Sequence, residues 1–194
     1  MGVETGRPRA AGTLALAACL GGAVWFALTA DERLGEGLFF VLLGSAVLAA
    51  LLTTRVQATL VVSATFASSM LAIAFLGPAA AFAIVVVAET LQWVVERYRA
   101  VSLAITIAVA GTPNLIAASL FPDVDSTGAA FPFVLAGFAV ACLVVNFAAV
   151  TALNALRDGR RVDLRPPREL LPALGLNVAL TVALAELYVQ SGLA

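Results

Sequence analysis

Long apolar runs, separated by short polar connections, fill almost the whole chain. Each run is close to the roughly 20 residues that an α-helix needs to cross the hydrocarbon core of a bilayer. Lipid satisfies no backbone polar group, so such runs are expected to form helices with internal hydrogen bonds. The pattern predicts an all-α, polytopic membrane helix bundle with seven spans, at residues 11–30, 38–54, 57–76, 78–95, 100–121, 129–156 and 170–193. Residues 1–10 are predicted to be a cytoplasmic tail, and residues 11–194 a single transmembrane domain.

Charged turns, glycine and proline mark the ends of the runs. Gly77 and Pro78 end the third run, and Pro78 suits the first turn of the next helix, where its missing N–H costs nothing. The sixth run has 28 residues, which at 1.5 Å each exceed a core of about 30 Å, so this helix is expected to tilt or project. A secretory signal peptide is the alternative for the first run, because Arg7 and Arg9 precede it and Ala30, at its end, is near a candidate cleavage point.

Composition supports a membrane location. Of 194 residues, 62% are hydrophobic and 12% are charged, against about 45–50% and about 25% in a soluble domain. The mean hydropathy is +1.03. These values exclude a water-soluble fold, and seven spans leave no room for a separate catalytic domain of about 100 residues. The net charge of −1 gives no reason to expect a nucleic-acid partner.

The arginines indicate the topology. The chain has no lysine or histidine, and ten of its eleven arginines lie in the N-terminal tail and in alternate connections between the runs. The other connections hold only Arg33. Arginine is enriched on the cytoplasmic side of membrane proteins, which predicts a cytoplasmic N-terminus and an external C-terminus. One cytoplasmic link could dock a partner, because it carries five of these residues, Arg157, Arg160, Arg161, Arg165 and Arg168.

A few polar side chains lie at membrane depth, where a charged group costs about 2.5–3.5 kcal/mol and is expected to face the bundle interior. We predict a ligand site formed by Glu89, Gln92, Asn114, Asn146 and Asn177. Pro113 removes one helical hydrogen bond beside Asn114, which favours a kink and a polar recess there. Two alternatives stay open: the amides hold helices together, or Glu89 is a buried acid that is protonated or paired with Arg97 or Arg55. The hydroxyl groups of the third run, Ser63, Thr65, Ser68 and Ser69, are expected to permit close helix packing rather than to bind a ligand.

Catalytic and metal-binding patterns are missing from the sequence. Without histidine, the chain lacks the commonest general base and the commonest metal ligand. Cys19 and Cys142 lie in apolar runs without a CxxC spacing, and no phosphate-binding glycine motif occurs. We therefore predict a protein that is not an enzyme and that binds no metal or cofactor.

Short motifs in a fixed order carry a family resemblance: Phe75-Leu76-Gly77-Pro78, Pro113-Asn114, Val145-Asn146, the link from Ala155 to Arg160, and Leu170-Leu171-Pro172. This order, over residues 35–194, resembles the N-terminal membrane sensor region of bacterial HD-GYP, GGDEF and histidine-kinase signalling proteins. That region is broadly similar to the substrate-binding subunits of energy-coupling-factor transporters. The family tends to have phenylalanine where this chain has Pro113.

The resemblance implies a sensory, ligand-binding input module in the bacterial inner membrane, without catalysis of its own. Its partners would be the lipid bilayer, a small-molecule ligand, and a cytoplasmic output domain or partner subunit. With an external C-terminus, one more helix would be needed before such an output domain. The alternatives are a substrate-binding membrane subunit of a transporter and a scaffold that binds no ligand.

Overall fold

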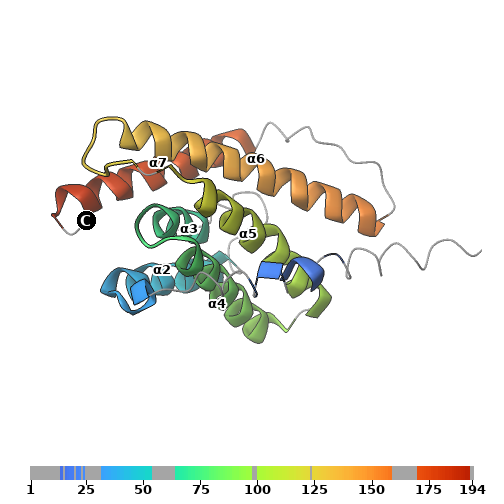
Figure 1. The fold of residues 1–194 in the computed structure, drawn as a ribbon. Helices are drawn as coiled ribbons and strands as arrows, with labels where there is room; N and C mark the ends of the chain where they lie inside the picture. Colours follow the sequence, from blue (N-terminus) through green and yellow to red (C-terminus); the bar gives the residue numbers. More distant parts are fainter. Residues whose placement is uncertain are drawn as a thin grey trace, which may run out of the picture.

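The computed structural model describes residues 14, 16–19, 21–22, 24, 32–53, 64–97, 100–122, 124–158 and 170–192. Across these ranges the chain is helical and forms no strand, which confirms the predicted all-α class for this part of the chain (Figure 1). The elements are η1 (Glu32–Gly35), α2 (Gly37–Thr53), α3 (Ala64–Phe75), α4 (Pro78–Glu96), α5 (Ala100–Leu120), α6 (Phe131–Asp158) and α7 (Leu170–Gln190). The described positions between residues 14 and 24 are also helical.

The helix bounds follow the predicted runs closely from α4 onward and at α2. α3 begins at Ala64 rather than at residue 57, and residues 54–63 lie outside the described part. Within the described residues, three stretches are long and apolar enough to cross a membrane, namely Pro78–Glu96, Ala100–Leu120 and Phe131–Leu153. Gly37–Leu52, Thr65–Phe75 and Leu174–Gln190 form shorter apolar helices. Seven crossings and the orientation of the termini therefore stay predictions.

The reversal between α3 and α4 occurs at the predicted glycine and proline. The backbone N–H groups of Leu76 and Gly77 both donate to the carbonyl oxygen of Ala72, at 2.9 and 2.8 Å, and close the end of α3. Gly77 has a φ of 92°, a conformation that a residue with a Cβ atom rarely adopts. Pro78 then occupies the first turn of α4. The two residues thus end one helix and start the next.

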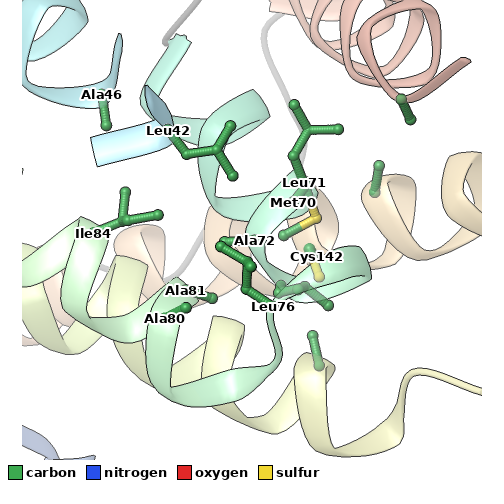
Figure 2. Close-up of a cluster of buried hydrophobic side chains, with 14 of the residues drawn as sticks. Leu42, Ala46, Met70, Leu71, Ala72, Leu76, Ala80, Ala81, Ile84 and Cys142 are labelled. Atoms are coloured by element: carbon green, nitrogen blue, oxygen red, sulfur yellow. The ribbon is translucent and has the colours of Figure 1, made fainter. Parts of the chain in front are cut away.

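α3 is the central helix of the bundle, because it packs against α2, α4, α5 and α7. Figure 2 shows Met70, Leu71 and Leu76 among side chains of the neighbouring helices. Many of the surrounding buried residues are alanines, including Ala46 on α2 and Ala81 on α4. Small side chains allow helix backbones to approach closely, which is how helices gain packing energy in lipid. The buried alanines therefore allow the helices to pack closely.

Two hydroxyl contacts join α2 to α3. The Oγ atoms of Ser45 and Ser68 lie 2.8 Å apart, and Ser45 also lies 2.8 Å from the carbonyl oxygen of Leu42. The Ser45 hydroxyl donates to the carbonyl oxygen of Leu42, and the two serine Oγ atoms are within hydrogen-bond distance of each other. The hydroxyl of Thr65 donates to the carbonyl oxygen of Ala46, at 3.2 Å. These bonds agree with the expected packing role of the hydroxyl groups in this helix.

A phenylalanine ring fills a notch made by two glycines. A Cβ atom placed on Gly111 of α5 would lie 2.9 Å from Cε2 of Phe82 on α4. One placed on Gly22 would lie 2.8 Å from Cζ and 2.9 Å from Cε2 of the same ring. Only glycine allows these helices to approach Phe82 so closely.

α6 and α7 pack together and lie across the α2–α5 group, in contact with α5 and α3 (Figure 1). α6 buries Phe131, Leu135 and Ala139, which are four residues apart and share one face. Its other side exposes large apolar residues such as Phe133 and Val144. A helix that is apolar all round and covered on one side only is suited to contact with lipid.

Aromatic contacts join α3, α6 and α7 at one end of the bundle. The ring centroid of Phe75 lies 5.7 Å from that of Phe131 and 4.8 Å from that of Tyr188. These residues stand at the C-terminal end of α3, the N-terminal end of α6 and the C-terminal end of α7. α3 and α7 therefore run in the same direction, and α6 runs in the opposite one.

The connection between α5 and α6 includes a side-chain-stabilised turn. Oδ1 of Asp125 accepts hydrogen bonds from the backbone N–H of Thr127, at 2.9 Å, and from its hydroxyl, at 2.8 Å. These bonds favour the charged carboxylate, so they hold the pKa of Asp125 below its ordinary value. Gly128 N–H donates to the carbonyl oxygen of Asp125 and completes the turn.

Candidate functional site

A cavity of about 490 Å³ lies among α3, α4, α5, α6 and α7. Each of the five helices contributes at least one polar side chain to it. These side chains are Thr65, Ser69, Glu89, Ser102, Thr106, Asn114, Asn146 and Asn177. Apolar residues such as Phe66 and Phe147 form the remaining wall. A volume of this size lies within the range of about 300–1,000 Å³ that is typical of small-molecule sites.

Four of the five residues in the predicted ligand site line this one cavity. Glu89, Asn114, Asn146 and Asn177 come from α4, α5, α6 and α7, respectively, and helix packing brings them together. Asn114 is 6% exposed and Asn177 is 3% exposed. The structure thus gathers most of the amide and carboxyl groups that the sequence places at membrane depth.

Gln92 does not line the cavity. Its Nε2 atom donates to Oε1 of Glu96, at 3.0 Å, in an exposed pair on the last turns of α4. Gln92 shares a helix face with Glu89 by spacing, but it lies nearly one turn further along α4. Glu186, on the second half of α7, also lies outside the residues that line the cavity.

Asn177 presents a buried acceptor without a donor. Its side-chain Oδ1 atom is buried and receives no hydrogen bond within the described part of the chain. Its backbone carbonyl, by contrast, accepts a hydrogen bond from the hydroxyl of Thr181, at 2.8 Å. A buried acceptor without a partner costs about 1–3 kcal/mol. Asn177 also lines the cavity, so its side-chain amide lies next to the space that a bound molecule would occupy.

Three of the four hydroxyl groups that line the cavity donate their protons to backbone carbonyls. Thr65 donates to the carbonyl oxygen of Ala46 on α2, as described above. Ser69 donates to the carbonyl oxygen of Phe66, at 2.8 Å, and Thr106 to that of Ser102, at 3.0 Å. A hydroxyl has one proton and two lone pairs, so these three oxygens keep only acceptor capacity. Thr65 and Ser69 were predicted to serve helix packing and Thr106 was not predicted as a site residue, so their place in the cavity wall was missed.

Glu89 is a half-buried carboxylate on the wall of this cavity. Within the described ranges no ion pair joins it to Arg97, one of its two expected partners, and Arg55 lies outside them. Arg97 instead ends α4 in a left-handed conformation, with its N–H donating to the carbonyl oxygen of Trp93, at 2.7 Å. None of the described residues that line the cavity is an arginine.

The cavity lies toward one end of the bundle. Its residues come from the first half of α3 and α7, such as Ser69 and Asn177, and from the second half of α4 and α6, such as Glu89 and Asn146. Since α3 and α7 run opposite to α6, these halves meet at the end away from the aromatic contacts of Phe75. Asn114, beyond the middle of α5, marks the inner part of the cavity.

A second cavity, of about 460 Å³, is almost entirely apolar and lies between α5 and α6 beside Leu14 and Ala18. Pro113 lines it, whereas the next residue, Asn114, lines the polar cavity. Pro113 has no N–H to donate to the carbonyl oxygen of Val109, a residue that borders both cavities. α5 continues through the proline as one helix and separates the two spaces.

The predicted docking link lies outside the described part of the chain. This applies to Arg160, Arg161, Arg165 and Arg168, and to the side chain of Arg157.

Among the described residues, no group of three or more histidine, cysteine, aspartate or glutamate side chains could hold a metal ion. Comparisons with protein-family models, curated proteins and solved structures found no match.

Proposed function

We propose that this protein is an integral membrane module that binds a small molecule in the polar cavity and acts as the sensory input of a bacterial signalling protein. The observation that carries the proposal is the convergence of Glu89, Asn114, Asn146 and Asn177 on one cavity. Polar groups at membrane depth are costly and commonly mark functional sites. Helix packing alone would pair these groups with one another, but Oδ1 of Asn177 has no donor in the described chain.

The proposed topology has seven spans, a cytoplasmic N-terminus and an external C-terminus, in the bacterial inner membrane. The distribution of arginines supports it, since ten of eleven fall on one side. The contacts of Phe75 with Phe131 and Tyr188 agree with it, because all three residues would lie at the external end. The polar cavity would then be nearer the cytoplasm.

A bound molecule would act by favouring one arrangement of the helices. It would touch α3, α4, α5, α6 and α7 at once, and α3 also packs against α2. A ligand that binds one arrangement more tightly shifts the population toward it. We propose that this shift is passed to a cytoplasmic output domain or partner subunit, with the arginine-rich link from Arg157 to Arg168 as the docking segment.

Ligand-dependent thermal unfolding of the purified full chain in detergent tests the proposal. A library of small metabolites is screened, and each stabilising compound is measured again with Glu89→Gln, Asn146→Ala and the surface control Glu96→Gln. We expect the stabilisation to fall in the two cavity variants and to persist in the control. The proposal is wrong if no compound stabilises the chain, or if every stabilising compound acts equally on all variants.

A further inference from the structure

We infer that the ligand of the polar cavity is an organic cation with several N–H donors, such as an amine or amidine attached to an apolar ring or chain. This inference rests on the proposed function and specifies the chemistry of the same site. It follows from the balance of donors and acceptors, from the charge of the lining residues, and from the apolar wall.

The donor and acceptor balance favours a ligand that donates hydrogen bonds. The hydroxyls of Thr65, Ser69 and Thr106 donate hydrogen bonds to backbone carbonyls, so their oxygens can only accept a hydrogen bond from a ligand. Oδ1 of Asn177 is an acceptor without a donor. In its ionised form the carboxyl group of Glu89 only accepts hydrogen bonds as well. The amides of Asn114 and Asn146, the NH2 group of Asn177 and the hydroxyl of Ser102 are able to donate, so these groups accommodate either kind of ligand group.

The charges along the cavity favour a cation. Among the described residues that line the cavity, Glu89 is the single ionisable one and none is an arginine. A ligand cation would therefore meet a carboxylate in a region of low dielectric constant, where such attraction is stronger than in water. An anionic ligand would meet the same carboxyl group, and the described lining residues supply no compensating positive charge. Hydrogen bonds between charged partners are also roughly twice as strong as neutral ones.

The apolar wall defines the remainder of the ligand. Phe66 of α3 and Phe147 of α6 belong to the lining, together with Leu143 and Val150. A planar cationic group can lie against an aromatic face, and this interaction contributes about 0.5–2 kcal/mol. A ring or short chain next to the cationic group would fill the apolar part of the volume. A small inorganic cation would leave this wall uncovered.

The experiment uses three probes of similar planar shape that differ in charge. Benzamidine is a cation with four N–H donors, benzamide is neutral, and benzoate is an anion. Binding of each to the full chain in lipid nanodiscs is measured by titration, with wild type, Glu89→Gln and Glu96→Gln. A second cavity variant, Asn177→Leu, removes the acceptor on α7 without changing charge. Size-exclusion profiles and helical content establish that each variant is folded.

We expect benzamidine to bind about tenfold more tightly than benzamide, the factor that corresponds to replacing a neutral hydrogen bond by a charged one. Benzoate should not bind measurably. Glu89→Gln should remove the preference for benzamidine, Asn177→Leu should weaken it, and Glu96→Gln should leave it unchanged. The inference is overturned if benzamidine does not bind, if benzamide or benzoate binds as tightly, or if Glu89→Gln retains the preference.

The outcome separates this inference from the proposed function. If the metabolite screen yields neutral or anionic ligands that depend on Asn146 and Asn177, the sensory function stands and the cationic class is wrong. If no compound of any charge depends on the cavity residues, both proposals fail.

Discussion

The contact of Phe82 with two glycines gives a quantitative test of the helix packing. In Gly111→Ala the new Cβ atom would lie 2.9 Å from Cε2 and 3.1 Å from Cδ2 of Phe82. Ordinary carbon contacts are about 3.5–4.0 Å, so the ring must move by roughly half an ångström or more. Phe82 is only 6% exposed, and its Cε2 atom is also close to Gly22 on a second helix. Moving the ring therefore disturbs other packed groups.

The expected magnitude combines two effects. Overpacking of a buried site costs about 1–3 kcal/mol. Alanine is also a better helix former than glycine, by about 0.8–1.0 kcal/mol. Gly44→Ala on α2 is the matched control, because a Cβ atom there meets nothing within 4 Å. Gly44→Ala should be slightly stabilising, and the free energies of unfolding of the two variants should differ by about 1–3 kcal/mol.

The assay is reversible denaturant unfolding of the full chain in micelles, followed by circular dichroism. A third variant combines Gly111→Ala with Phe82→Leu, in which a smaller side chain makes room for the new methyl group. The double variant should be more stable than the sum of the single changes implies, because the two sites share one contact. If Gly111→Ala is as stable as Gly44→Ala, the close packing of α4 on α5 at Phe82 is refuted.

Two further predictions concern polar groups inside the bundle. Asn177→Leu removes an unpartnered buried oxygen next to a cavity that has room for the larger side chain. In the absence of ligand, this substitution should raise the free energy of unfolding by about 1–3 kcal/mol. Each kcal/mol corresponds to a rise in Tm of about 2–4 °C. The exposed control Gln190→Leu should change stability by less than about 0.5 kcal/mol, and a destabilised Asn177→Leu would mean that the amide oxygen has a donor. For Ser45 and Ser68, a double-mutant cycle with alanine should give a coupling energy of about 0.6 kcal/mol, and additive losses would contradict the interhelical bond.

The ends of the helices could be predicted from the sequence because they depend on local chemistry. Gly77 and Pro78 mark a reversal whose φ value and missing N–H are properties of those residues alone. Charged and polar connections likewise interrupt the apolar runs, so α4 begins at Pro78 and α5 at Ala100, as expected. The cost of polar groups in lipid was also sufficient to predict that Asn114 and Asn177 are buried.

The side chains of each helix that face the cavity were harder to predict than the helix ends. A membrane helix is apolar toward lipid and apolar toward its neighbours, so the hydrophobic period that identifies the buried face of a soluble helix is weak. Gln92 shares a face with Glu89 by spacing, yet it lies beyond the cavity. Thr65 and Ser69 resemble ordinary packing residues in the sequence, and only the direction of their hydroxyl bonds shows what they offer the cavity.

The aromatic contacts at one end of the bundle determine how far the opposite end of α6 would move if the helix rotated. Phe75 holds the first turn of α6 through Phe131 and the last turns of α7 through Tyr188. α6 has 28 residues, so at 1.5 Å each it is a lever about 42 Å long with its pivot at Phe131. A rotation of about 5° at that pivot would displace the distal tip by about 4 Å. A molecule bound against Asn146 would press on α6 far from Phe131. The resulting displacement would be largest at the C-terminal end of α6, where the arginine-rich link begins.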